Sequence, residues 1–335
     1  MHEKKLLKVD CIVCHHKGTL VLQAIKSILL SKGVEVNIIV ATSDSKSTFH
    51  GAKTIYVEGG PTNKRNQAYY VSKSDYIAFF DDDIEATPTA VYEMLKVLVQ
   101  DQVGMVFGKL RNMEFRDRFD EAGSYLTGTG FLWSRAQSGI KDVGQYDTVE
   151  PVLAGKSASC MIRRDVFAKV GFFDNSYEIL GEETDLAWRV WLAGYKVLYV
   201  PKSVTYHAFN TKWKPPDMYT PKRVYYNGCR NYLTMLYTNL GKKVWIIPLL
   251  TQLTVWSSAG FGMLITGKFS AGLHIFRGIA YFFVHIRQIW RKRFIVQRLI
   301  RRISDKELFP IIVRNPSISY YIKRFFHYIK TGRHG

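Results

Sequence analysis

The stretch DYIAFFDDD, residues 75–83, places five apolar or aromatic residues directly before three aspartates. A short run of this kind is typical of a strand that is buried on both faces, as in a parallel sheet. Three adjacent carboxylates at a strand end repel one another, and a divalent cation held between them relieves that repulsion. The alternative is a solvated acidic turn before a helix, whose dipole favours carboxylates near its first turn.

Outward from this stretch, strand-like and helix-like patterns alternate along the chain. Strand patterns occupy residues 9–16, 34–42, 53–57 and 75–81, and helical patterns occupy residues 19–33, 63–74 and 87–100. The alternation predicts a doubly wound α/β domain with a largely parallel sheet. Ligands of such sheets bind beyond the carboxyl ends of the strands. Three of these ends carry the polar sequences CHH, TSDS and DDD, so we expect the functional site at this edge.

The Cys-x-x-Cys-His pattern that begins at Cys11 is also the pattern of c-type haem attachment. Haem is attached in this way to exported proteins, and we expect no secretory signal because residues 1–16 lack an apolar core and a small-residue cleavage site. A zinc site is disfavoured because the sequence has no second Cys-x-x-Cys pair. Cys11 and Cys14 are therefore interpreted as apolar residues of a buried strand. His15 and His16 lie where that strand opens into the binding edge.

Charge is distributed unevenly along the chain, which has a formal net charge of +19. Residues 268–335 contain 15 Lys and Arg against two acidic residues, and no acidic residue lies between Asp217 and Asp305. Such asymmetry indicates binding either to nucleic acid or to an anionic membrane. The run VWIIPLLTQLTVWSSAGFGMLITG, residues 244–267, is uncharged and long enough to cross about 30 Å of hydrocarbon. We therefore expect a membrane partner and no nucleic acid.

A weaker apolar run, residues 273–286, precedes the strongly basic segment 287–302. Apolar residues recur at helical spacing through this segment, at Trp290, Phe294, Ile295, Leu299 and Ile303. The pattern is typical of a helix that lies in the interface of an anionic membrane. The alternative is a core helix with a solvated basic face. The sequence leaves open whether the apolar runs span the membrane as a hairpin or lie in its interface.

Further motifs follow the aspartates in a fixed order along the chain. They are NKRN at residues 63–66, GEETDLAWRVWLAGYKVLYVP at residues 181–201 and VTYH at residues 204–207. With FFDDD, they resemble the motifs of the inverting nucleotide-sugar glycosyltransferases of family 2, over roughly residues 8–235. The resemblance implies a GT-A fold, which is α/β with a Rossmann-like, doubly wound mixed sheet, for residues 1–240. An α-helical, membrane-associated region would then occupy residues 241–335.

The resemblance also implies roles for the aspartates and their neighbours. Asp81 would face the nucleoside, Asp82 would belong to the donor site, and Asp83 would ligate Mn²⁺ or Mg²⁺ on the diphosphate. His207 would complete the metal site or contact the diphosphate, although a histidine satisfied at a strand end is the plainer interpretation. Arg65 would contact the donor.

Glu183 stands where the family places its catalytic base, usually an aspartate, and Glu182 is the second candidate. Such a base would accept the proton of the acceptor hydroxyl. The plainer interpretation is an acidic first turn of a helix that also includes Asp185. Asp185, Gly155 and Arg230 are assigned to the acceptor site or to the shell around it.

The nucleotide remains open because the sequence departs from the family pattern at the first two strand ends. His15 and His16 replace a Pro-Thr-x-Asn-like turn, and Asp44 lies slightly later than the aspartate that usually reads the base. These three residues are assigned to donor binding. UDP, GDP and dTDP sugars are all compatible with the sequence.

The acceptor is inferred from the tail. The chain lacks the Gln-x-x-Arg-Trp motif of processive synthases, and residues 223–241 resemble the Arg-Asn segment of non-processive, rhamnosyltransferase-like members. We therefore expect transfer of a single sugar. Because a soluble acceptor would not require the uncharged run and the basic helix of the tail, we expect the acceptor to be a membrane-bound, polyprenyl-linked glycan in cell-surface glycan or glycoprotein assembly. The catalytic domain would lie on the cytoplasmic face of the cell membrane. The alternatives are direct transfer to polyprenyl phosphate and a catalytically silent membrane protein that binds sugar nucleotides.

Overall fold

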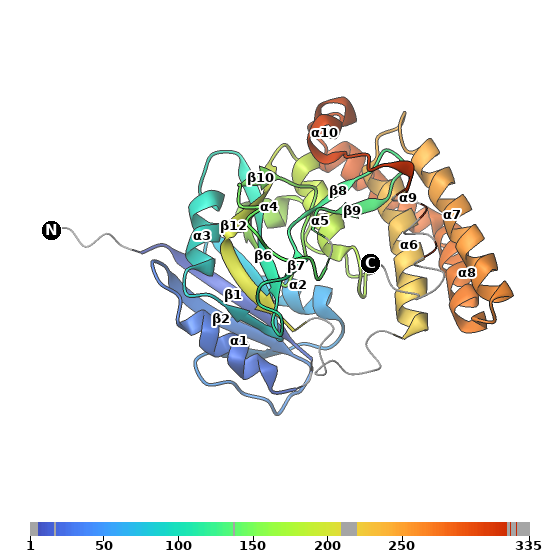
Figure 1. The fold of residues 1–335 in the computed structure, drawn as a ribbon. Helices are drawn as coiled ribbons and strands as arrows, with labels where there is room; N and C mark the ends of the chain where they lie inside the picture. The colour runs from blue at the N-terminus through green and yellow to red at the C-terminus, as the bar shows by residue number, and fades with distance from the viewer. Residues whose placement is uncertain are drawn as a thin grey trace.

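The computed structural model describes residues 6–16, 18–136, 138–208 and 220–319, together with Ile322 and Phe326. Within them the chain forms a mixed α/β sheet covered by helices, with a group of C-terminal helices packed beside it (Figure 1). The predicted mixed α/β class is confirmed.

The main sheet has ten strands, and the order along its principal path is β10-β12-β6-β11-β4-β1-β2-β3. Its parallel strands are β1 (Lys8–His15), β2 (Glu35–Thr42), β3 (Lys53–Tyr56), β4 (Tyr76–Asp81), β6 (Val103–Asn112) and β12 (Lys196–His207). The antiparallel strand β11 (Ser159–Arg163) lies between β4 and β6. The smaller strands are β5 (Ile84–Ala86), β7 (Phe119–Glu121) and β10 (Glu150–Pro151), and a separate pair is formed by β8 (Ser124–Leu126) and β9 (Leu132–Ser134).

Strand register brings the predicted polar ends to one edge. Cys14 of β1 lies opposite both Asp81 of β4 and Ala41 of β2, so these three strands end together. Further along the strand order, beyond β11 and β6, His207 of β12 pairs with Ile84 of β5, which directly follows the third aspartate. The turn between β4 and β5 therefore lies beside the end of β12.

Alternate residues of the central strands face two apolar clusters on opposite sides of the sheet. Phe79 packs in the cluster that includes α2, α4 and α5, whereas Phe80 packs in the cluster that includes α1 and α3. These helices are α1 (Leu20–Leu29), α2 (Pro61–Val71), α3 (Ala90–Leu98), α4 (Arg164–Lys169) and α5 (Glu182–Leu192). Burial on both faces explains why the sequence of β4 is continuously apolar.

The C-terminal helices pack closely on one another through small residues. They are α6 (Pro221–Asn239), α7 (Ile246–Ile265), α8 (Phe269–Val284), α9 (Ile286–Phe294), the π-helix η1 (Ile295–Ile300) and α10 (Asp305–Ile312). A Cβ atom on Gly272 would lie 2.8 Å from the carbonyl oxygen of Gly260, and one on Gly278 would lie 3.0 Å from Cys229. Helix α6, which precedes the predicted boundary at residue 240, shares its apolar cluster with α7, α8 and α9.

Among the helices that the structure describes, none is by itself both long and apolar enough to cross a membrane. Only α8 taken together with residues 286–300 reaches that length and composition, and the two parts are bent by 63°.

Candidate active site

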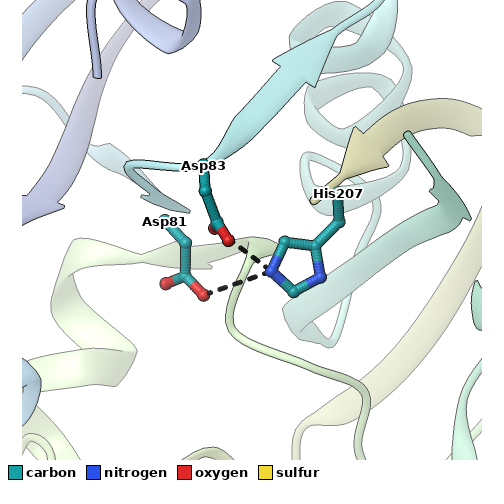
Figure 2. A group of neighbouring side chains, drawn as sticks. All are labelled: Asp81, Asp83 and His207. Carbon is teal, nitrogen blue, oxygen red and sulfur yellow. Dashed lines mark ion pairs between the residues drawn. The ribbon is translucent and has the colours of Figure 1, made fainter. Parts of the chain in front are cut away.

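Two aspartates and one histidine converge at the carboxyl edge of the sheet (Figure 2). One ligand atom from each of Asp81, Asp83 and His207 lies within 4.8 Å of the others. The His207 Nε2 atom is 3.2 Å from Asp83 Oδ1 and 3.9 Å from Asp81 Oδ2. Carboxylate oxygens suit both Mn²⁺ and Mg²⁺, and histidine is a common metal ligand, so these residues fit the predicted cation. We call them the metal group.

The metal group is assembled by backbone pairing. Asp81 ends β4, His207 ends β12, and Asp83 lies in the turn before β5. The pairing of β5 with β12 is continued by a hydrogen bond of 3.0 Å from the Ala208 amide to the Asp83 carbonyl. Backbone pairing therefore places Asp83 next to His207, although the two residues are more than 120 positions apart in the sequence.

A buried carboxylate orients the histidine. The His207 Nδ1 atom lies 2.8 Å from Asp120 Oδ2, and because a carboxylate can only accept, Nδ1 carries the proton and Nε2 faces the aspartates. Burial alone would raise the pKa of Asp120, but the Lys156 ammonium, 2.7 Å away, and the bond from His207 hold it well below its usual range. Burial lowers and Asp83 raises the pKa of His207, with a net rise to about 9. Asp120 and Lys156 lie outside every motif recognised in the sequence.

Arg65 connects the metal group to the candidate bases. This residue of α2 is 2 % exposed; its Nη2 donates to Asp81 Oδ1 at 2.9 Å, and its Nη1 lies 3.5 Å from Glu182 Oε1. Removing one partner from a buried ion pair costs about 3–5 kcal/mol of stability. The predicted contact with the donor remains a prediction, whereas the link between Asp81 and Glu182 is present in the structure.

The two glutamates at the start of α5 differ in their surroundings. Helix α5 begins after Gly181, whose φ of 90° lies in the left-handed region that favours glycine. Glu182 pairs with Arg65. Glu183 is partly buried, and burial together with the neighbouring charge of Glu182 raises its pKa well above the usual range. A carboxylate with a raised pKa is a stronger proton acceptor, which favours Glu183 over Glu182 as the base.

The residues predicted to bind the donor extend along the same edge. Asp82 Oδ2 accepts a hydrogen bond of 3.0 Å from the His16 backbone amide, which ties the β4 end to the β1 end. Burial, and less strongly the charges of its two neighbouring aspartates, raise the pKa of Asp82 to about 7. Asp44 is exposed and caps its own loop by accepting bonds from the Lys46 amide and the Ser47 hydroxyl.

His15 is the last residue of β1, at the carboxyl edge of the sheet. It is buried, with Nδ1 2.9 Å from Thr42 Oγ1 and Nε2 3.3 Å from the Gly18 carbonyl. Its own carbonyl accepts a bond of 2.7 Å from Lys64 Nζ, a buried ammonium of the NKRN motif to which no role had been assigned. These contacts fix the first strand end, and a donor contact by His15 remains a prediction.

The three residues assigned to the acceptor are engaged in packing. Asp185 pairs with Arg189 at 2.8 Å and accepts a bond of 2.8 Å from Asn239, which joins α5 to α6. A Cβ atom on Gly155 would lie 2.9 Å from Phe107, so close packing accounts for this glycine. Arg230 is buried on α6 and donates to a carbonyl of the loop before α5. Their assignment to the acceptor remains a prediction.

Several solved structures have a similar fold. One is GalNAc-T7 with UDP, GalNAc and Mn²⁺, at a TM-score of 0.54 and 14% identity, covering 77% of this chain and 51% of that one. Another is the mannosyltransferase PcManGT from Pyrobaculum calidifontis with GDP-Man and Mn²⁺, at 0.50 and 12%, covering 83% and 87%. A third is S. aureus TarS, at 0.51 and 14%, covering 77% and 45%. These similarities confirm the predicted glycosyltransferase fold of the GT-A type.

Sequence comparisons agree with the fold. The probable glycosyltransferase YdaM of Bacillus subtilis (strain 168) is 26% identical over 156 residues, which are 46% of this chain and 35% of that protein. Polypeptide N-acetylgalactosaminyltransferase 6 of Bos taurus is 27% identical over 157 residues, or 42% and 25%. The chain thus matches about a third or less of these relatives' length. Residues 76–291 match the model of glycosyl transferase family group 2, and the chain therefore belongs to that family.

Proposed function

We propose that this chain is a metal-dependent, inverting glycosyltransferase that moves one sugar from a nucleotide-sugar donor to a hydroxyl of a polyprenyl-linked glycan. The observation that carries the proposal is the metal group together with Arg65, which links Asp81 to Glu182, the neighbour of Glu183. Solved structures of similar fold with UDP or GDP-Man and Mn²⁺ support a nucleotide donor.

Asp81, Asp83 and His207 would hold Mn²⁺ or Mg²⁺ at the donor diphosphate. When bound, the cation would take up negative charge that grows on the leaving nucleoside diphosphate. Asp120 keeps the His207 ring in one orientation, so that its Nε2 atom faces the aspartates.

Glu183 would act as the general base. Its carboxylate accepts the proton of the acceptor hydroxyl while that oxygen forms a bond to the anomeric carbon. The bond from the same carbon to the diphosphate breaks on the opposite side, which inverts the anomeric configuration. A positioned base contributes about 10²- to 10⁴-fold to the rate.

The C-terminal helices support an acceptor at a membrane surface. Ile247, Ile265 and Val284 are 73%, 86% and 77% exposed, and Trp290 and Leu299 are more than half exposed. Exposed arginines accompany them on α9, on η1 and two residues after η1, at Arg287, Arg291, Arg298 and Arg302. Exposed aromatic and aliphatic side chains among arginines suit the interface of an anionic membrane. We therefore infer a site on the cytoplasmic face of the cell membrane and a role in cell-surface glycan or glycoprotein assembly.

The proposal is tested first by thermal shift on detergent-purified protein. UDP, GDP and dTDP, each with and without Mn²⁺ or Mg²⁺, are compared on the natural chain and on Asp83→Ala. A ligand that binds the native state raises the Tm. One nucleotide should raise it only with the cation, and the effect should be lost in the variant. A folded protein whose Tm responds to none of these ligands would contradict the proposal.

A transfer assay then tests the acceptor. Polyprenyl-diphosphate sugars and polyprenyl phosphate are offered with the donor identified by thermal shift. Transfer to the former that requires Glu183 supports the proposal, whereas transfer to the phosphate that persists in Glu183→Gln indicates the direct route, because a phosphate acceptor needs little help from a base.

A further inference from the structure

The loop that precedes the candidate bases, residues 173–181, is held on one side by α2. The Asn66 carboxamide donates to the Phe173 carbonyl at 2.8 Å and accepts from the Phe173 amide at 3.0 Å. The Thr62 hydroxyl donates to the Tyr177 carbonyl at 3.2 Å. We call residues 173–181 the base loop.

The C-terminal helices hold the base loop on its other side. Asn231 of α6 donates from Nδ2 to the carbonyls of Ile179 at 2.9 Å and Leu180 at 2.8 Å. Lys292 of α9 donates to Asp174 Oδ2 at 2.5 Å. The Arg230 guanidinium and the Lys292 ammonium also donate to Ser176, at its carbonyl and at its hydroxyl.

The hydrogen bonds of Asn231 lie beside two consecutive residues in the left-handed conformation. Leu180 has a φ of 69° and Gly181 a φ of 90°, and a non-glycine residue in the left-handed region persists only where its surroundings hold it. Asn231 is 3% exposed, and its Oδ1 accepts a bond of 3.0 Å from Arg230 Nε, which fixes the carboxamide. The next residue after Gly181 is Glu182.

We propose that Asn231 is a positioning residue for glycosyl transfer, which holds Leu180 in its left-handed conformation and thereby sets the direction from which Glu182 and Glu183 leave the base loop. The proposal rests on the function proposed above. Lys292 reinforces this role from α9, the helix on which Arg287, Arg291 and Trp290 are exposed. The C-terminal helices, which carry the exposed apolar side chains and arginines, thus also contact the base loop.

The test compares two substitutions of the same chemistry. Asn231→Asp keeps the shape of the side chain but removes the two donors to the base loop. Gln297→Glu removes the Nε2 donor that bonds the Thr238 and Asn239 carbonyls at 2.8 and 3.1 Å, between helices of the same bundle but away from the loop. Each variant loses two partly buried hydrogen bonds to backbone carbonyls, so the number and kind of lost bonds are matched.

Asn231→Asp should lower kcat about tenfold or more, while the donor KM and the affinity for Mn²⁺ change less than twofold. Gln297→Glu should retain kcat within about twofold. Hydrogen–deuterium exchange of residues 176–183 should be faster in Asn231→Asp alone. Equal losses of kcat in both variants, or a raised donor KM with unchanged kcat, would overturn the proposal.

Exchange also separates this proposal from the function on which it rests. If the natural chain transfers no sugar, the proposed function fails, and faster exchange of the base loop specific to Asn231→Asp still supports its positioning by Asn231. Unchanged exchange overturns that positioning. If Asn231→Asp does not fold, Lys292→Gln takes its place, with an expected loss of kcat of about threefold because its ion pair is partly exposed.

Discussion

At the carboxyl edge of the sheet, the metal group is positioned by backbone pairing between strands. Beside the C-terminal helices, the base loop is instead positioned by hydrogen bonds and ion pairs from side chains. The metal group follows from the register of β4, β5 and β12. The base loop has no strand partner among the described residues and is held by the amides and cations of α2, α6 and α9. Strand pairing uses backbone hydrogen bonds, so it should survive many side-chain substitutions. A loop held by side chains can change its conformation when one of them is replaced. Substitutions should therefore act differently in the two regions.

The largest effect is expected at the candidate base. Glu183→Gln should lower kcat about 10²- to 10⁴-fold, because the amide cannot accept the proton of the acceptor hydroxyl. Donor binding, measured by thermal shift with Mn²⁺, should persist. The matched control is Glu178→Gln, an exposed change in the base loop that should leave kcat within about twofold. Normal turnover by Glu183→Gln would remove this residue from the base role.

The pH profile sharpens the same assignment. The base must be deprotonated, and burial with the Glu182 charge raises the pKa of Glu183. Activity should therefore be present above that raised pKa and fall about tenfold per pH unit below it. The acid limb of kcat/KM should lie at higher pH than the usual value for glutamate, about 4.3. A limb at the usual value would contradict a buried base.

The support of the metal group is tested at Asp120. Asp120→Asn should weaken Mn²⁺ binding about 10- to 100-fold, because the carboxylate that fixes the His207 ring is lost. Calorimetric titration of Mn²⁺ into the purified protein measures this effect without turnover. Asp117→Asn, a change at an exposed aspartate near the same strand, is the control. Equal affinities in the two variants would show that the backbone alone positions His207.

The smallest effect is expected on the helices. Arg291→Gln should weaken binding to vesicles with anionic lipid about fivefold, since each basic residue near such a surface contributes about 1 kcal/mol. Flotation of the detergent-free protein with vesicles measures it. The control is Arg163→Gln, at the C-terminal end of β11 and outside the C-terminal helices. Binding of the natural chain should weaken at high salt, because salt screens the attraction between arginines and anionic lipid. Loss of binding that is the same in both variants would argue against a specific contact by α9.

Much of the sheet and its edge was predictable because local patterns determine it. Continuous apolar runs mark strands buried on both faces, and polar residues directly after them mark the strand ends, so the place of Asp81 and Asp83 at this edge was predictable from local pattern. The resemblance to the family, and not the pattern, assigned Asp83 and His207 to the metal and Asp81 to the nucleoside, and the structure brings all three together. The helical start at Glu182 was also visible from its acidic first turn.

The supporting residues were not predictable, since they depend on contacts between distant segments. Asp120 lies 87 positions from His207 and carries no motif. Asn231 belongs to the recognised Arg-Asn segment, but its bonds to the base loop required the packing of α6. The resemblance assigned Gly155 and Asp185 to the acceptor site or to the shell around it; their packing contacts required the structure, and the acceptor assignment remains a prediction.

The burial of all four cysteines has a practical consequence for spectroscopy. Burial raises the pKa of each thiol, to about 11 for Cys14 and higher for Cys11, Cys160 and Cys229. Maleimides react with the thiolate, so the natural cysteines of the folded chain should remain unlabelled near neutral pH. One new cysteine at Ile265, the most exposed apolar residue of α7, would then carry a fluorophore alone. Its emission would report directly on the depth of this helix in lipid.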